Sequence, residues 1–128
     1  MSELTDRNKA VMRRIYDEMW NESNPALAKE LFLHPEGVEK FVSGFLQSFP
    51  DLQHTVIEII AEGDQVAAHF ASSGTHSGEW MGYAATGKSI HYSGVTWARI
   101  ADGKIIEHDT CWDQAGLIEQ VDTNHPEN

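Results

Sequence analysis

The sequence has little cysteine, few basic residues and no long apolar run, and each shortage argues against a class of protein. A single cysteine, Cys111, excludes an internal disulfide framework and is compatible with a reducing compartment. Nine Lys and Arg against 20 Asp and Glu give a formal net charge of -11, which argues against nucleic acid or an anionic membrane as a partner. No segment approaches the roughly 18 consecutive apolar residues of a membrane span, and the N-terminus lacks the apolar stretch of a signal peptide. We therefore expect a cytoplasmic protein.

What the sequence does contain is enough apolar material for one core. The chain has 128 residues, of which 41% are hydrophobic, and this predicts a single domain over residues 1–128. Four Trp and five Phe fit a core with an aromatic-lined cavity, and they fit equally well a small core that aromatic side chains simply fill. The polar tail, residues 122–128, is expected to fray.

The first half of the chain has helical periodicity. Apolar residues recur every four positions across residues 5–21, which predicts an amphipathic helix capped by Thr5 or Asp6. A short helix is expected over residues 26–33, after a proline that suits a first helical turn. A third helix is expected over residues 35–49, because its apolar residues are spaced alternately by three and one and Pro50 ends the pattern.

The second half changes to strand patterns separated by tight turns. Segments rich in β-branched residues predict strands over 52–62, 65–75, 89–100 and 104–108. Helices followed by an antiparallel meander predict an α+β domain with helices packed on one face of a curved sheet. Such an arrangement leaves a conical space between helices and sheet.

The end of the last strand carries an unusual density of titratable groups, in Glu107, His108, Asp109 and Asp113. Strict alternation places Asp109 and Asp113 on one face and His108 on the other, although a β-bulge would shift the assignment. Residues four apart on a strand are about 13 Å apart, so the two aspartates are too distant to share a proton. By spacing alone, Asp113 is more readily a cap of the tail helix, and His108 a histidine on the outer face of the sheet.

Several short stretches, taken together and in order, resemble the SnoaL-like polyketide cyclase (ester cyclase-like) family of the nuclear transport factor 2-like superfamily. The resemblance extends from about Asn8 to Gln120. The stretches are residues 14–21 (RIYDEMWN), 49–52 (FPDL), 62–66 (EGDQV), 74–78 (GTHSG), 86–88 (TGK), 102–108 (DGKIIEH), Asp113 and 116–120 (GLIEQ).

This resemblance implies a cone-shaped α+β barrel, a curved and mostly antiparallel sheet with the N-terminal helices on its concave face. It also implies a homodimer or larger homo-oligomer with a pocket for a small apolar molecule. Family members of known activity close a ring by intramolecular aldol condensation of a polyketide ester, with no metal or cofactor. An aspartate near the end of their last strand exchanges a proton with the substrate, and it matches Asp113 in residues 113–117 (DQAGL). His108 matches the histidine of the family's glutamate-histidine-tryptophan motif.

Two departures from the family pattern bear on function. Asp109 stands where the family usually has tryptophan, and the segment over residues 31–38 lacks a strand or loop that usually edges the pocket. These departures favour the competing hypothesis of a non-catalytic ligand-binding or dimerisation module. A dehydratase, an isomerase or an epoxide hydrolase would also fit the scaffold, because fold does not fix function.

The remaining candidates are expected to contact substrate, each with a structural alternative. Trp80 and Met81 would form an apolar wall at the mouth of the pocket or cover the core. Further substrate contacts are assigned to Trp97, His91, Asp109 and Tyr16, of which Tyr16 is the most readily a core residue. His76 is expected to bond loop backbone. No metal is expected, because the strand histidines His69, His91 and His108 lie on three separate strands without a supporting carboxylate.

Overall fold

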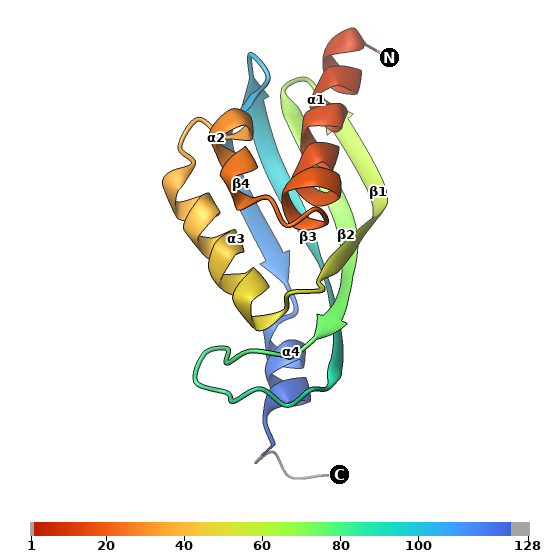
Figure 1. The fold of residues 1–128 in the computed structure, drawn as a ribbon. Helices are drawn as coiled ribbons and strands as arrows, with labels where there is room; N and C mark the ends of the chain where they lie inside the picture. Colours follow the sequence, from red (N-terminus) through yellow and green to blue (C-terminus); the bar gives the residue numbers. More distant parts are fainter. Residues whose placement is uncertain (1, 124–128) are drawn as a thin grey trace.

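The computed structural model describes residues 2–123 and places most of the helices before the strands, as predicted (Figure 1). The helical elements are α1 (Glu3–Arg14), the π-helix η1 (Ile15–Trp20), the 3-10 helix η2 (Pro25–Leu27), α2 (Ala28–Leu31), α3 (Glu36–Ser48) and, at the end of the chain, α4 (Gln114–Val121). Figure 1 shows α1, α2 and α3 on the same face of the sheet, with α4 at the end of the molecule opposite the start of α1.

The four strands pair in chain order as an antiparallel meander. They are β1 (Gln53–Glu62), β2 (Gln65–Thr75), β3 (Ser89–Ala101) and β4 (Lys104–Trp112), in the order β1-β2-β3-β4. The β3–β4 turn has positive φ at Asp102 (51°) and Gly103 (77°), the combination that a tight two-residue hairpin favours. The prediction of an α+β domain with a curved antiparallel sheet and helices on its concave face is confirmed. β1 and β4 do not pair with each other, so the sheet itself is open and the helices close its concave side (Figure 1).

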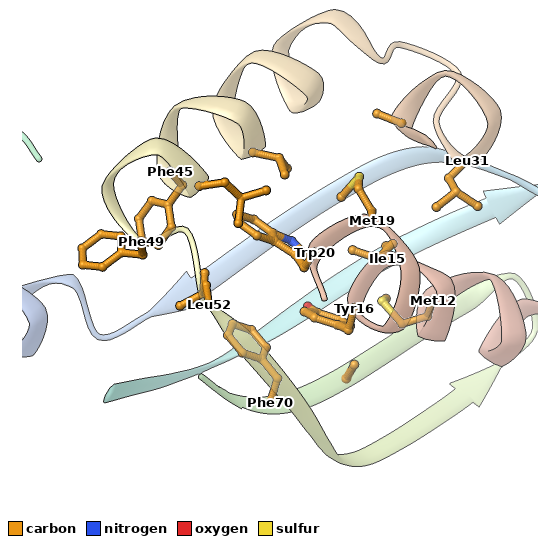
Figure 2. Close-up of a cluster of buried hydrophobic side chains, with 14 of the residues drawn as sticks. Met12, Ile15, Tyr16, Met19, Trp20, Leu31, Phe45, Phe49, Leu52 and Phe70 are labelled. Atoms are coloured by element: carbon orange, nitrogen blue, oxygen red, sulfur yellow. The ribbon is translucent and has the colours of Figure 1, made fainter. Parts of the chain in front are cut away.

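The first helix begins earlier than predicted and changes its winding halfway along. Ser2, and not Thr5 or Asp6, is the N-cap, because its side chain accepts a hydrogen bond from the Thr5 amide. From Ile15 the chain continues as a π-helix, in which the Asn21 amide donates to the Tyr16 carbonyl five residues back. π-Turns are frequent at functional sites. This one places Tyr16 and Trp20 on the side of the helix that faces the sheet (Figure 2).

The core lies between the helices and the concave face of the sheet. Figure 2 shows α1 and η1 packing toward α3 and the sheet through a mixture of aliphatic and aromatic side chains. The predicted apolar face of α3 is buried at Val42, Phe45 and Leu46, and Phe49, the C-cap of the helix, is buried as well. Phe41, on the edge of that face, is 56% exposed. Within residues 2–123, the structure contains no helix with both the length and the apolar character needed to cross a membrane.

Of the tail that was predicted to fray, Asp122 and Thr123 follow α4, and residues 124–128 lie outside the described part of the chain.

Candidate active site

A cavity of about 460 Å³ lies between the helices and the sheet, within the size range of small-molecule sites. Apolar and aromatic side chains dominate its wall, and polar groups reach it from η1, the strands and the segment before α3. The residues that line it are Ile15, Tyr16, Met19, Trp20, Phe32, His34, Gly37, Val38, Phe41, Val42, Phe45, His54, Phe70, Tyr92, Thr96, His108, Asp109, Thr110 and Trp112.

The shortened segment before α3 still forms part of this wall. Phe32 makes a parallel bridge to Ile105, and the Leu33 amide donates to the Ile105 carbonyl at 3.0 Å. These contacts hold the segment against β4, so His34 and Val38 reach the cavity. The segment therefore closes one side of the pocket without the extra strand or loop of the family pattern.

A β-bulge decides which residues of β4 face the cavity. In the register of β3 and β4, Ile100 pairs with Ile105 and Arg99 pairs with Glu107, so Ile106 has no partner of its own. The extra residue puts Ile105 and His108 on the same, inner face. The interpretation of His108 as an outer-face histidine, which alternation favoured, is therefore wrong: the ring lines the cavity.

His108 lies at the rim of the cavity between an aromatic ring and a carboxylate. Its ring meets that of Phe32 edge to face, with the ring centres 5.1 Å apart. Burial lowers the pKa of His108 below its ordinary value, because desolvation disfavours the imidazolium, and the neighbouring Asp109 acts in the opposite direction. At neutral pH the imidazole is therefore mostly unprotonated and able to accept a proton.

Three hydroxyl groups form a chain across the cavity wall. The Tyr16 hydroxyl bonds the Thr96 hydroxyl, and Thr96 Oγ1 lies 3.0 Å from Thr110 Oγ1. Thr96 and Thr110 pair directly across β3 and β4, so both side chains point to the same face. Burial raises the pKa of Tyr16 to about 12, which keeps its phenol protonated.

His54 contributes an imidazole from β1 to the aromatic part of the cavity. The Asn21 side chain fixes its backbone, accepting from the His54 amide at 2.7 Å and donating to the His54 carbonyl at 2.9 Å. The ring packs against those of Trp20 and Tyr16, with centre distances of 4.9 and 5.3 Å. Nδ1 is buried and has no hydrogen-bond partner within residues 2–123. Burial lowers the pKa of His54 to about 3, so the ring is neutral.

Asp113, predicted as the acid or base, lies outside the cavity lining. It is the N-cap of α4, where its Oδ1 accepts from the Gly116 amide at 2.9 Å, and its side chain is exposed. The helix-cap alternative is thus present in the structure.

Of the other predicted substrate contacts, only some lie at the cavity. Tyr16 and Asp109 line the cavity. His91 and Trp97 lie on the outer face, where Trp97 Nε1 donates to Gln65 Oε1 at 2.9 Å. In the β2–β3 loop, Trp80 is buried in the core and Met81 is 59% exposed.

His76, predicted to bond its own loop, is fully buried and does so: its Nδ1 accepts from the Thr86 amide at 3.3 Å.

Several cavity residues were absent from the sequence-based candidates, notably His34, His54, Thr96, Thr110 and Trp112. Alternation in β3 grouped Thr96 with Ile90, Tyr92 and Ile100, which are buried, and that signal could have identified it. Thr110 shares the face of His108, which alternation had turned outward, so only the strand register identifies it. Among residues 2–123, no three His, Cys, Asp or Glu side chains converge in a group that could hold a metal ion.

An open, curved antiparallel sheet with helices and an apolar cavity on its concave face is the fold of the nuclear transport factor 2-like class of α+β proteins. The sequence profile of the family described as SnoaL-like polyketide cyclase matches residues 10–121, and the chain belongs to this family. A search of curated proteins found no match.

Solved structures with the same fold include three instructive examples. AclR from Streptomyces galilaeus, a proposed hydroxylase, is 26% identical with a TM-score of 0.85, over 96% of this chain and 87% of AclR. IdmH from Streptomyces antibioticus, a proposed polyketide cyclase, is 25% identical with a TM-score of 0.75, over 91% of this chain and 99% of IdmH. A proposed SnoaL-like polyketide cyclase from a Jannaschia species is 20% identical, with a TM-score of 0.89 over 98% of both chains, and shows the shared fold alone.

Proposed function

We propose that the protein is a cofactor-independent, cyclase-type enzyme that deprotonates a neutral, apolar, carbonyl-bearing small molecule in this cavity. The observation that carries the proposal is a neutral imidazole, His108, on the wall of an apolar pocket large enough for a polycyclic ligand. Family membership supports cyclase chemistry, and the resemblance to IdmH, a proposed polyketide cyclase, supports a polyketide-like substrate.

The chemistry needs one group that accepts a proton from carbon and later returns it. The carbon–hydrogen bond next to a carbonyl breaks, its proton goes to His108, and its electron pair forms an enolate. The enolate carbon then attacks a second carbonyl of the same molecule and forms a carbon–carbon bond. The resulting alkoxide takes the proton from the imidazolium, which returns His108 to its neutral form.

The charge of the cavity wall supports a neutral substrate. Within residues 2–123, no Lys or Arg lines the cavity, and burial keeps His54 uncharged. Asp109 at the rim and the net charge of -11 both oppose the entry of an anion. A free carboxylic acid or a phosphate would therefore bind worse than the corresponding neutral ketone or ester.

Asp113 is the competing candidate for the acid–base group. The family resemblance supports it, but its carboxylate is engaged by the Gly116 amide, and it does not line the cavity. Geometry therefore favours His108 as the acid–base group, and mutation of each residue can distinguish their roles.

Exchange of carbon-bound hydrogen for deuterium provides the test. β-Tetralone, a bicyclic ketone with acidic hydrogens next to its carbonyl, is expected to exchange them faster in heavy water with the protein than without. His108→Asn is expected to reduce the catalysed rate about a hundredfold, the usual contribution of one general base. The rate is measured by proton NMR as the loss of the α-hydrogen signal.

Asp113→Asn is the matched control for the exchange experiment. It should leave the exchange rate within about twofold while lowering the free energy of unfolding by about 1 kcal/mol, since asparagine is an adequate but uncharged cap. If Asp113→Asn abolishes exchange and His108→Asn does not, Asp113 is the acid–base group. If β-tetralone binds and no variant-dependent exchange occurs, the non-catalytic binding module is the correct alternative.

We also propose that the protein forms a homodimer through the outer face of its sheet. Ile57, Ile60 and Val95 are all exposed on this one face, with Ile60 63% exposed, and apolar side chains that share an exposed face favour a protein–protein contact there. Cys111 is exposed beside Val95 in the neighbouring strand.

Ile60→Glu is expected to convert the dimer to monomer at micromolar protein, because it places a charge in an apolar contact. Leu4→Glu, at a similarly exposed leucine on α1, is the control and should leave the dimer intact. Sedimentation velocity distinguishes the two states. A wild-type protein that sediments as a monomer contradicts the proposal.

A further inference from the structure

We propose that the Thr110 hydroxyl is the donor that binds the carbonyl oxygen of the ligand, at the end of the chain Tyr16–Thr96–Thr110. This inference deepens the proposed function, on which it rests for the nature of the ligand, by assigning the site that recognises the carbonyl oxygen. It rests on a count of protons, on the burial of the three side chains and on their position relative to His108.

The proton count leaves one donor without a partner. Tyr16, Thr96 and Thr110 carry one hydroxyl proton each, and the two hydrogen bonds between them use two of the three. Within residues 2–123, no carboxylate or backbone carbonyl accepts from any of these hydroxyls. Whatever the direction of the chain, one O–H is therefore available to an acceptor in the cavity.

Acidity and burial select the direction of the chain. A phenol is a better donor than an aliphatic hydroxyl, and an aliphatic oxygen is the better acceptor, so Tyr16 donates to Thr96. If Thr110 donated to Thr96, the proton left over would be that of the buried Thr96, so burial favours donation from Thr96 to Thr110. Tyr16 and Thr96 are buried, whereas Thr110 is exposed toward the cavity. The free proton then lies on Thr110, and donation along the chain polarises that last hydroxyl and strengthens it as a donor.

The position of Thr110 suits a carbonyl whose neighbouring carbon faces His108. The two residues lie on the inner face of β4, two positions apart, which corresponds to about 7 Å along the strand. That separation allows a carbonyl oxygen to bond Thr110 while the adjacent carbon–hydrogen bond points at the imidazole. When the proton leaves, negative charge develops on the oxygen that Thr110 holds, which is where a donor lowers the barrier.

The recognised chemistry is thus a neutral hydrogen-bond acceptor, a ketone or ester carbonyl, on an apolar frame. A hydrocarbon of the same shape satisfies the aromatic wall but leaves the Thr110 proton without an acceptor. The pair β-tetralone and tetralin, which differ only in the carbonyl, measures this contribution directly.

The experiment compares the affinities of both compounds for wild-type protein, Thr110→Val and Thr110→Ser by calorimetry or ligand-observed NMR. The ratio of β-tetralone to tetralin affinity is expected to fall about fivefold to tenfold in Thr110→Val, the size of one net hydrogen bond. Thr110→Ser, which keeps the hydroxyl, should retain the wild-type ratio. Valine suits a strand and matches threonine in shape, so the fold should be preserved.

An equal loss for both compounds in Thr110→Val, or no loss for either, overturns the inference. A second measurement on the wild-type protein does not depend on any variant. The carbonyl carbon of labelled β-tetralone should move downfield in the complex relative to its position in an apolar solvent, and an unmoved resonance also overturns the inference.

The two proposals fail separately. If no catalysed exchange is observed but the preference for the ketone depends on Thr110, the enzymatic function is refuted and the carbonyl subsite stands. Exchange that requires His108, combined with a ketone preference that ignores Thr110, supports the enzyme and refutes this subsite.

Discussion

Acidification from about pH 7 to about pH 4 is expected to lower the free energy of unfolding by about 3 kcal/mol through His54 alone. The ring is buried among Tyr16, Trp20 and Phe70, and burial lowers its pKa from the ordinary 6.5 to about 3. Protonation of the folded protein would place an imidazolium in an apolar wall, so it occurs only at the acid end of the range.

The direction in which the free energy of unfolding changes with pH follows from proton uptake. Between the folded pKa near 3 and the unfolded pKa of 6.5, the unfolded chain holds more protons at His54 than the folded protein. Stability from this group is therefore complete above 6.5, falls as the pH decreases, and is lost at a pH near 3. Burial lowers the pKa of His108 in the same direction, and hydrogen bonds from Thr75 lower that of Asp51, which adds a further loss below the ordinary pKa of a carboxyl.

Urea unfolding of wild-type protein and His54→Phe across this pH range measures the effect. Phenylalanine fills the same aromatic site without a titrating nitrogen, and the buried Nδ1 has no partner to lose, so the variant should have a much flatter profile. His69→Gln, on the outer face of β2, is the control that should keep the steep wild-type profile. Parallel profiles for wild type and His54→Phe would contradict the assignment.

The order and type of the elements were predictable because they depend on local pattern. The alternating spacing in α3 placed its buried face, and the glycine-containing turns separated the four strands correctly. The π-helix η1 was not predictable, since its winding depends on a distant contact: Asn21, at its end, bonds the backbone of His54 in β1. A helical periodicity gives no information on an interaction between segments 33 residues apart.

The candidate site was predictable only at residues whose side-chain chemistry marks them as candidates without knowledge of their neighbours. His108 and Tyr16 were candidates from the sequence, and both line the cavity. The orientation of His108 could not be derived, because the bulge at Ile106 depends on how β4 aligns with β3. Thr96 and Thr110 were passed over for the same reason: neither is chemically notable alone, and their hydroxyls meet only through strand pairing.

The aromatic cluster around the cavity predicts the largest effect of a single truncation. Six other aromatic rings lie within 6.1 Å of the Phe45 ring, measured between ring centres: those of Trp20, Phe41, Phe49, Trp80, Tyr92 and Trp112. The rings of Trp20 and Phe41 also meet, at 6.3 Å. Phe45 is buried in the last turn of α3, and Figure 2 shows it beside Phe49 at the end of that helix.

Phe45→Ala is expected to lower the free energy of unfolding by about 4 kcal/mol, because the rings around it come from α3, η1 and the strands and cannot all collapse into the space. Phe41→Ala, one turn earlier in α3, removes the same group from a half-exposed position and should cost less than about 1 kcal/mol. Urea unfolding at neutral pH measures both. Since both rings line the cavity, a comparable loss in the two variants would mean that the cavity wall, and not the buried junction at Phe45, holds α3 against the sheet.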